Sequence, residues 1–428
     1  MINKLKPKSE FGRNVVTLMT GTAVAQAIPI AISPILTRLY TPEDFGIFAL
    51  YIAIVSLLSI FVTGRYELAI MLPTSDTEAF YILVATLSIS LLLSALIFIF
   101  IVLCAPWISQ ITHNTDLGGW LYLIPVSILI SGWYQSLNFW TNRKKDYRSL
   151  SQGIILQSSS NALFNTSFGY LKLGFSGLIT TNIISGFLSL FFLIYRNKKH
   201  LKKSRSHPEP KKIYDQLKRY KRFPLHTLPQ NFVYQGFQQL PIFFIQSYFS
   251  TLILGAYSLS LRTLSTPLSI LSNSFGQVFY QKASELYRQD KQTLYDYTKQ
   301  TFLKLFVLSS TVAIIGVWFL PDIFAFIFGT PWKIAGTIAQ YLTIFLVLKF
   351  AVEPLTKLYL IAEENLFYLK WEIVRFVLIS LYLLFISMFF SKLSIETFFL
   401  IFALLQFFMY SFIAIPILHK QSFLWKNK

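Results

Sequence analysis

The side chains best able to do chemistry in this sequence are charged groups inside long apolar segments. Arg262 is one, and two acid–base pairs at helical spacing are the others: Lys349 with Glu353, and Glu372 with Arg375. A charge near the middle of a bilayer costs about 2.5–3.5 kcal/mol on insertion scales, so it needs a partner or a ligand. Each pair can neutralise itself on one helix face, which leaves a structural ion pair as the alternative. Arg262 has serine, leucine and threonine rather than an acid at helical spacing, so the sequence predicts an anionic ligand for it.

Amide and hydroxyl side chains form stripes at helical spacing on several apolar segments. In the segment 151–170, for example, Gln157, Asn161 and Asn165 are each four residues apart. Such stripes either bind helices together or line a hydrated cavity, where amides and hydroxyls suit the hydroxyl groups of a glycan. Because the stripes occur in both halves of the chain, we predict a cavity lined mainly by the first, seventh and eighth apolar segments. Its predicted polar lining residues are Gln26, Asn231, Gln235, Gln238, Ser258, Ser269 and Asn273.

Two further arginines lie at the ends of the first predicted hairpin. Arg38 lies at its outer end and Arg65 at its inner end, where Glu67 follows two residues later and can offset the charge. Both arginines can also act as simple interface anchors. With the intramembrane cations, they complete the predicted substrate-binding set: Arg38, Arg65, Arg262, Lys349 and Arg375.

The composition indicates what kind of elements must position these groups. Of the 428 residues, 54% are hydrophobic and only 13% are charged, whereas soluble domains carry about 25% charged residues. This excludes a soluble enzyme, a disordered chain and a fibrous protein, and it predicts an all-α polytopic membrane protein. Hydropathy predicts twelve transmembrane helices, at 15–36, 47–63, 80–104, 119–140, 151–170, 174–195, 225–248, 253–278, 302–320, 335–357, 367–389 and 397–418.

Lysine and arginine set the predicted orientation. Of the 38 basic residues, 31 lie in alternate loops and termini and only 4 in the loops between them. Basic residues collect on the cytoplasmic side, so we predict that both termini are cytoplasmic. This distribution accounts for the net charge of +19 without any nucleic-acid partner. The most basic loop, 196–224, is either a topology signal only or a surface for anionic membrane lipids.

The basic loop also divides the predicted helices six and six. We predict an N-terminal six-helix lobe at 1–200, a basic cytoplasmic linker loop at 201–223 and a C-terminal six-helix lobe at 224–428. A faint parallel repeat supports this division, since Pro29 and Gly46 of the first half have counterparts in Pro241 and Gly255. Parallel repeats are a transporter architecture with the substrate site between the halves. The predicted fold is therefore two six-helix lobes around a central cavity.

Several kinds of chemistry have no signature in this sequence. The phosphate-binding loop of ATPases and the His-Glu-x-x-His zinc motif do not occur, and the single Cys104 excludes a disulfide within the chain. The five histidines lie in predicted loops or at helix ends, so we expect no metal and no cofactor. The first and seventh predicted helices carry no carboxylate, which disfavours a cation or proton carrier there. A membrane-embedded glycan polymerase or ligase stays open as the alternative, although such an enzyme needs longer outer loops than this chain provides.

One stretch resembles a known family. The run Pro34–Leu50 (PILTRLYTPEDFGIFAL), followed by RYELAI from Arg65, resembles the N-terminal signature of the Wzx-type flippases of O-antigen and capsule precursors. These belong to the multidrug/oligosaccharidyl-lipid/polysaccharide (MOP) exporter superfamily. The resemblance is strongest in this run and looser over the rest of the chain. The chain departs from the superfamily's drug and cation exporters, which often carry an acid in the first span, and from the usually fourteen-span lipid II flippases.

The resemblance implies a function that is not enzymatic. It implies alternating access of two lobes around a cationic cavity, in the bacterial inner membrane, with Arg262 fitting the expected cation. The implied substrate is an oligosaccharide repeat unit on undecaprenyl diphosphate, moved from the cytoplasmic to the periplasmic leaflet for O-antigen, lipopolysaccharide or capsule synthesis. The expected partners are this substrate, membrane lipids, a polysaccharide polymerase and a chain-length regulator. A drug or cation exporter of the same superfamily is the remaining alternative.

Overall fold

The computed structural model describes residues 10–111, 118–204, 209–390, 393–420, 422 and 424. Within these residues the secondary structure is helical, and no strand occurs. The helices of at least 18 residues number twelve in this part of the chain, in agreement with the predicted helical fold. They are α1 (Glu10–Leu39), α2 (Pro42–Ser59), α3 (Asp76–Ile111), α4 (Ile124–Arg143), α5 (Tyr147–Tyr170), α6 (Phe175–Ser204), α8 (Leu228–Tyr248), α9 (Thr251–Gln289), α10 (Lys291–Gly316), α12 (Lys333–Val352), α14 (Asn365–Phe389) and α15 (Ile395–Leu418).

Shorter helices connect the long ones. Three are α-helical: α7 (Pro210–Arg219), α11 (Leu320–Phe328) and α13 (Lys357–Ile361). The others are short helices of 3₁₀ or π type: η2 (Tyr66–Met71), η3 (Gly118–Leu123), η4 (Phe223–Thr227), η5 (Val317–Phe319), η6 (Thr330–Trp332) and η7 (Glu353–Thr356).

Eight helical segments of the described chain are long and apolar enough to cross a membrane. The protein is therefore a multi-pass membrane protein. The long helices outside this set are α4, α5, α8 and α9, which are interrupted by serine, asparagine and glutamine. Length alone makes them candidates to cross as well, so the count of twelve spans stays a prediction. The segments that qualify are Thr17–Leu39, Pro42–Ser59, Asp76–Cys104, Phe175–Lys202, Lys291–Phe328, Thr330–Ile361, Leu366–Phe389 and Ile395–Leu418.

The chain divides into two compact units, Met1–Ser247 (unit 1) and Tyr248–Lys428 (unit 2). The division falls at the end of α8, whereas the predicted C-terminal lobe begins before that helix. The two six-helix lobes and their linker therefore stay a prediction, and each unit is described by itself.

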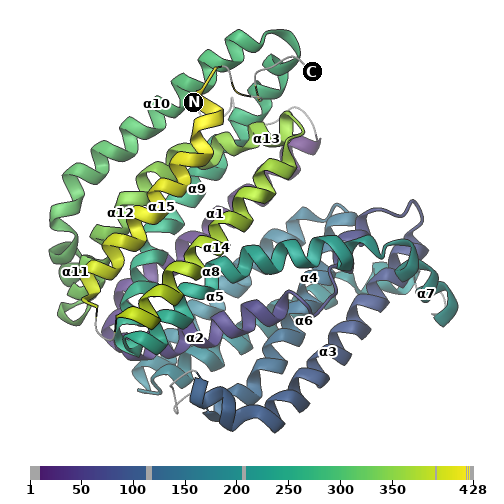
Figure 1. Cartoon of the computed structure of the whole chain (residues 1–428). Helices are drawn as coiled ribbons and strands as arrows, with labels where there is room; N and C mark the ends of the chain where they lie inside the picture. The colour runs from purple at the N-terminus through teal and green to yellow at the C-terminus, as the bar shows by residue number, and fades with distance from the viewer. Residues whose placement is uncertain are drawn as a thin grey trace. The chain divides into compact units, whose positions relative to one another are not determined.

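In unit 1, α6 lies beside α4 (Figure 1) and also packs against α2 and α5. Helix α1 lies along α5, and α3 lies along α4. Polar contacts connect several of these helices. The hydroxyls of Tyr51 on α2 and Ser127 on α4 are 2.7 Å apart, and the Asn197 amide of α6 donates to Thr141 Oγ1 of α4 at 2.7 Å. Hydrogen bonds of this kind satisfy polar side chains that lipid cannot satisfy.

The start of α2 explains part of the family-like sequence run. Thr41 is its N-cap, and Thr41 and Asp44 form a capping box over the first turn. The Asp44 carboxylate also accepts a hydrogen bond of 2.7 Å from the backbone N–H of Phe175, at the start of α6. Gly174 permits this approach, because its φ of +57° is left-handed and a Cβ there would lie 2.8 Å from the Asp44 carboxylate. The same acid therefore begins α2 and fixes the start of α6.

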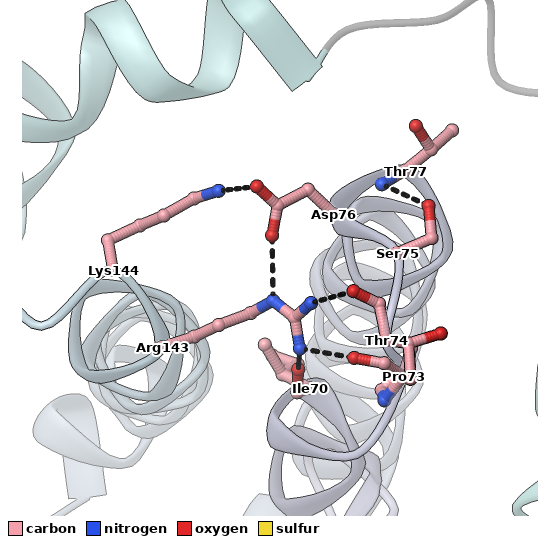
Figure 2. A network of polar contacts seen from close by, with 8 residues as sticks. All are labelled: Ile70, Pro73, Thr74, Ser75, Asp76, Thr77, Arg143 and Lys144. Atoms are coloured by element: carbon pink, nitrogen blue, oxygen red, sulfur yellow. Dashed lines mark hydrogen bonds and ion pairs between the residues drawn. The ribbon is translucent and has the colours of Figure 1, made fainter.

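A second polar network closes the end of α4 against the turn before α3 (Figure 2). The Arg143 guanidinium donates to the Asp76 carboxylate at 3.1 Å and to the backbone carbonyls of Ile70 and Pro73 at 3.2 and 2.7 Å. Lys144 donates to the other Asp76 oxygen. Arginine suits this position because its planar group serves several acceptors at once. The network fixes the turn between η2 and α3.

In unit 2, α12 contacts α9, α10, α11 and α15 (Figure 1). Its approach to α11 is close at Gly336, where a Cβ would lie 2.4 Å from the Cα of Pro321. Aromatic rings fill the space beside α15. Phe398 lies 5.1 Å from both Phe249 and Phe399 between ring centroids, and it is completely buried.

Candidate functional site

Unit 1 contains a cavity of about 440 Å³ between α2, α4, α5, α6 and α8. We call it the polar cavity. Nine of its fourteen lining residues carry a hydroxyl or an amide, and none of the fourteen is charged. They are Ile52, Val55, Ser56, Ser59, Ser127, Ile130, Ser131, Tyr134, Gln135, Gln157, Asn182, Ile183, Gly186 and Gln235.

The hydroxyls and amides of the polar cavity leave capacity for a ligand. Gln135 Nε2 donates to Ser131 Oγ at 3.3 Å, one turn earlier on α4. Ser59 Oγ is buried and has no hydrogen-bond partner in the described protein. A buried hydroxyl at a roomy polar cavity requires water or a ligand to complete its hydrogen bonds. Each amide can donate two hydrogen bonds and accept two. A sugar hydroxyl also donates and accepts, so an amide can bind it in either role.

Unit 2 contains a smaller cavity of about 70 Å³ between α9, α12 and η7, which we call the small polar pocket. It brings together two predicted site residues, Ser269 and Lys349, and adds Glu353. Ser269 Oγ donates to the Thr266 carbonyl at 2.9 Å. The pocket is also lined by Ser265, Leu268, Ser272, Leu346 and Phe350.

The predicted residues of α8 have different surroundings. Gln235 lines the polar cavity. Asn231 donates to the Thr227 carbonyl at 2.8 Å, and Gln238, which is exposed, donates to the hydroxyl of Tyr234 at 3.4 Å. Gln26 lies half-buried on α1 and lines neither cavity. The structure therefore brings one of these four amides to the polar cavity.

The two hairpin arginines lie apart from both cavities. Arg38 is exposed in the last turn of α1. Arg65 has a left-handed backbone with φ of 62°, and its guanidinium lies 3.2 Å from the carboxylate of Glu67, which is completely buried. This contact is the local ion pair expected from the sequence. Substrate binding by Arg38 and Arg65 stays a prediction.

The intramembrane cations of unit 2 also differ from one another. Arg375 is buried, pairs with Glu372 at 3.3 Å, and lies over the rings of Trp371 and Tyr410 at 4.4 and 4.9 Å. These contacts match the structural ion pair that the sequence left open as the alternative. Arg262 is half-buried on α9 and lines neither cavity, as is also true of Ser258 and the exposed Asn273. A role for these residues in substrate binding stays a prediction.

Sequence reasoning missed most of the polar cavity. The predicted chamber was lined mainly by the first, seventh and eighth spans, whereas α8 is the only one of those helices that contributes to this cavity. The spacing of Gln157 gave a signal, and the low hydropathy of α4 and α5 gave another. Asn182 and the serines of α2 gave none, because a single polar residue on an apolar helix does not reveal which neighbour it faces. Among the described residues, no group of three His, Cys, Asp or Glu side chains is placed to hold a metal ion.

Comparison with solved structures finds this fold in membrane transporters. An inward-facing multidrug resistance MATE family transporter of the MOP superfamily matches with a TM-score of 0.65 at 14% identity, over 95% of this chain and 99% of that chain. The lipid II flippase MurJ, inward closed, matches with a TM-score of 0.65 at 13% identity, over 94% and 98%. A MOP superfamily transporter from Pyrococcus furiosus matches with a TM-score of 0.59 at 16% identity, over 96% and 95%. A comparison with curated proteins finds no match.

The fold is similar to that of solved MOP-superfamily transporters and of a lipid II flippase. The family described as polysaccharide biosynthesis protein matches residues 35–337, and the chain belongs to that family. The match begins within the run Pro34–Leu50, so the resemblance predicted from that run is confirmed at this level.

Proposed function

We propose that the protein is a flippase for oligosaccharide repeat units linked to undecaprenyl diphosphate, precursors of O-antigen or capsule. The observation that carries this proposal is the polar cavity, which is large, uncharged and lined by amides and hydroxyls. The family supports a role in polysaccharide synthesis. A relative in fold, MurJ, is described as a lipid II flippase, which supports a lipid-linked cargo.

The physical need for such a cavity follows from the cargo. Sugar hydroxyls and a diphosphate lose their water when they enter hydrocarbon, and each unreplaced hydrogen bond costs about 2–7 kcal/mol. Gln135, Gln157, Asn182 and Gln235 offer amides from four different helices to replace those bonds. The lipid tail needs no such help, because it stays in the bilayer. In this proposal unit 1 carries the glycan through polar contacts that any sugar can use.

The charge of the cargo supplies a direction. Moving about two negative charges outward across 100 mV, with the cell interior negative, is favourable by roughly 4–5 kcal/mol. The proposed cation contacts for the diphosphate are Arg262 and Lys349 of unit 2. We propose alternating access around these groups, with both termini cytoplasmic, in the bacterial inner membrane. A polysaccharide polymerase and a chain-length regulator are the proposed partners on the product side.

A drug or cation exporter is the second candidate, because the MATE relative is described as a multidrug resistance transporter. A cation-binding cavity needs negative charge to offset desolvation. The fourteen residues that line the polar cavity include no Asp or Glu. The lining therefore favours a neutral, hydroxyl-rich ligand over a cationic drug.

The test uses the purified full-length protein in vesicles that carry a lipid-linked oligosaccharide with a labelled sugar. Exposure of the sugar on the opposite leaflet is measured with a membrane-impermeant lectin, with and without a potassium-diffusion potential. We expect movement of the sugar that slows more when the potential is collapsed than when the pH gradient is collapsed. Export of an organic cation without movement of the lipid-linked sugar would establish the second candidate. Growth of the glycan chain would establish a polymerase.

A further inference from the structure

Unit 2 contains a third hollow, of about 390 Å³, between α9, α10 and α12. We call it the apolar groove. Its walls are mainly aliphatic and aromatic, and they include Leu264, Leu271, Leu308, Val312, Leu346 and Phe350. Its character is opposite to that of the polar cavity in unit 1, which is of similar size.

Three hydroxyl side chains line the apolar groove, and two of them, Ser309 and Thr343, donate to backbone carbonyls of their own helices. Ser309 Oγ donates to the Leu305 carbonyl at 2.9 Å, one turn earlier on α10. Thr343 Oγ1 donates to the Ala339 carbonyl at 2.8 Å on α12. These side chains therefore place no hydrogen-bonding demand on an occupant, and the groove suits a purely hydrocarbon chain.

The groove continues onto the apolar outer surface of α10. Val312 lines the groove and is 65% exposed, and its neighbour Ile314 on the same helix is 69% exposed. Exposed aliphatic side chains on a membrane-spanning helix face lipid. A hydrocarbon chain can therefore enter the groove sideways from the bilayer.

The inner end of the groove adjoins the small polar pocket. Leu268, Leu346 and Phe350 line both hollows. Along α12 the groove residue Val347 is followed by Lys349 and Glu353 of the pocket, toward the end of the helix that we predict to be cytoplasmic.

The small polar pocket has hydroxyls that the protein leaves for an occupant. Ser272 is 4% exposed, and its Oγ, like that of Ser265, is buried without a hydrogen-bond partner in the described protein. Together with the Lys349 ammonium they can donate to a phosphate. The carboxylate of Glu353 at the same pocket limits the negative charge that can be bound. One groove with one polar end fits an amphiphile with a single tail better than a two-chain phospholipid.

We propose that the apolar groove binds the isoprenoid tail of a polyprenyl phosphate, with its phosphate at the small polar pocket. This inference rests on the proposed function for the identity of the lipid. It adds a site on unit 2 that holds the carrier in the cytoplasmic leaflet, separate from the polar cavity for the sugar. The carrier is then retained by its tail and phosphate, whatever glycan it bears.

The first test fills the groove. Gly316 lines it, and a Cβ at this residue meets no atom within 4 Å, so the first carbon of the Gly316→Phe side chain has room. We expect its ring to occupy part of the groove. Ile314→Phe on the same helix is the matched control outside the groove lining. The purified full-length protein is titrated with undecaprenyl phosphate, and binding is measured by native mass spectrometry against phosphatidylglycerol as competitor. We expect about tenfold weaker binding for Gly316→Phe and no change for the control, because several buried methylene contacts are lost.

The second test concerns the phosphate end. Lys349→Gln should weaken binding of undecaprenyl phosphate, and Glu353→Gln should tighten it, because the two changes alter the charge of the pocket in opposite directions. Unchanged binding in Gly316→Phe, or equal competition by phosphatidylglycerol, overturns the proposal. The same variants are assayed for movement of the labelled sugar. If the unaltered protein moves no sugar but Gly316→Phe weakens its lipid binding, this site stands and the proposed function is rejected. If the unaltered protein moves sugar and the variants bind the lipid as it does, the site alone is rejected.

Discussion

The two units are built from long helices of similar length. The contacts between helices inside unit 1 nevertheless differ from those inside unit 2. In unit 1 the helices meet through polar groups, such as the 2.7 Å contact between the hydroxyls of Tyr51 and Ser127. In unit 2 contacts between aromatic rings accompany the polar ones, and Tyr257 stacks on Phe399 with 5.7 Å between ring centroids. The hollows follow the same division, since unit 1 has the polar cavity and unit 2 the apolar groove.

This difference shows that the side-chain composition of the helices decides whether the cavity between them is polar or apolar. Helices α4, α5 and α8 are among those too polar to qualify as spans by hydropathy, and all three line the polar cavity. The fourth, α9, contributes its serines to the small polar pocket and its leucines to the apolar groove. Low hydropathy in a long membrane helix therefore marks a wall of a cavity, because polar side chains facing lipid would be too costly.

The largest expected effect concerns the aromatic packing of unit 2. Phe398 is completely buried among the rings of Phe249, Phe399 and Tyr382. Phe398→Ala should lower the free energy of unfolding by about 3–5 kcal/mol, because its neighbours lose their contacts with the ring. Thermal unfolding of the purified protein in detergent measures this. Phe408→Ala, which removes a 65% exposed ring from the same helix, should leave the melting temperature nearly unchanged. Equal shifts in the two variants would show that aromatic packing does not hold unit 2.

Much of this fold could be predicted from the sequence, because long apolar runs bounded by turn residues identify helices directly. The eighth predicted span ends at residue 278, whereas the helix α9 continues to Gln289. Hydropathy stops at Lys282 and Glu285, but these charged residues are good helix formers and carry the helix beyond the apolar region. The family resemblance of a run such as Thr41–Gly46 could also be recognised from the sequence. The hydrogen bond from the Phe175 N–H to the Asp44 carboxylate could not be predicted from it.

The site was less predictable for a physical reason. A stripe such as that of Gln157 shows which face of a helix is polar, but not which other helix meets it. The polar cavity combines Gln157 with Asn182 and Ser131 from two other helices, and only the packing of α4, α5 and α6 brings them together. The spacing of Arg375 and Glu372 predicted their ion pair, but it did not reveal the rings of Trp371 and Tyr410 beside the guanidinium.

The next expected effect is on transport and tests whether the polar cavity is the route of the sugar. Ser131→Trp places a large ring in this cavity, and overpacking or displacement of the ligand costs about 1–3 kcal/mol, so sugar movement should fall by roughly tenfold to a hundredfold. Binding of undecaprenyl phosphate should persist, because the apolar groove is untouched. Phe187→Trp, at a 55% exposed position on α6, is the control. If Ser131→Trp moves sugar at the normal rate, the glycan does not use unit 1.

A gentler change asks whether the amides of the polar cavity matter for their hydrogen bonds. The double variant Gln157→Leu with Gln235→Leu keeps the side-chain size but removes both amides. Two hydrogen bonds of about 0.5–1.5 kcal/mol each predict a loss of about tenfold in the apparent affinity for the lipid-linked oligosaccharide. The affinity for undecaprenyl phosphate without sugar serves as the internal reference and should not change. A parallel loss for both ligands would mean that the variant disturbs the protein rather than the sugar contacts.

The smallest expected effect is on the free energy of unfolding, and it distinguishes a hydrogen bond beside the polar cavity from one in dry packing of unit 2. Tyr51→Phe removes the hydroxyl that contacts Ser127 at the polar cavity, and Tyr359→Phe removes the hydroxyl that donates to the Ile413 carbonyl at 2.8 Å in unit 2. Water in the polar cavity can replace the first bond, so we expect a loss of about 0.5 kcal/mol in unfolding free energy. Tyr359 and Ile413 are buried and line neither the polar cavity, the small polar pocket nor the apolar groove, so no water replaces their bond and Tyr359→Phe should cost about 1–2 kcal/mol. Thermal unfolding of the two variants compares them directly. A larger loss for Tyr51→Phe would mean that the cavity of unit 1 is dry, and the contrast between the two units would then lie in their side chains and not in their access to water.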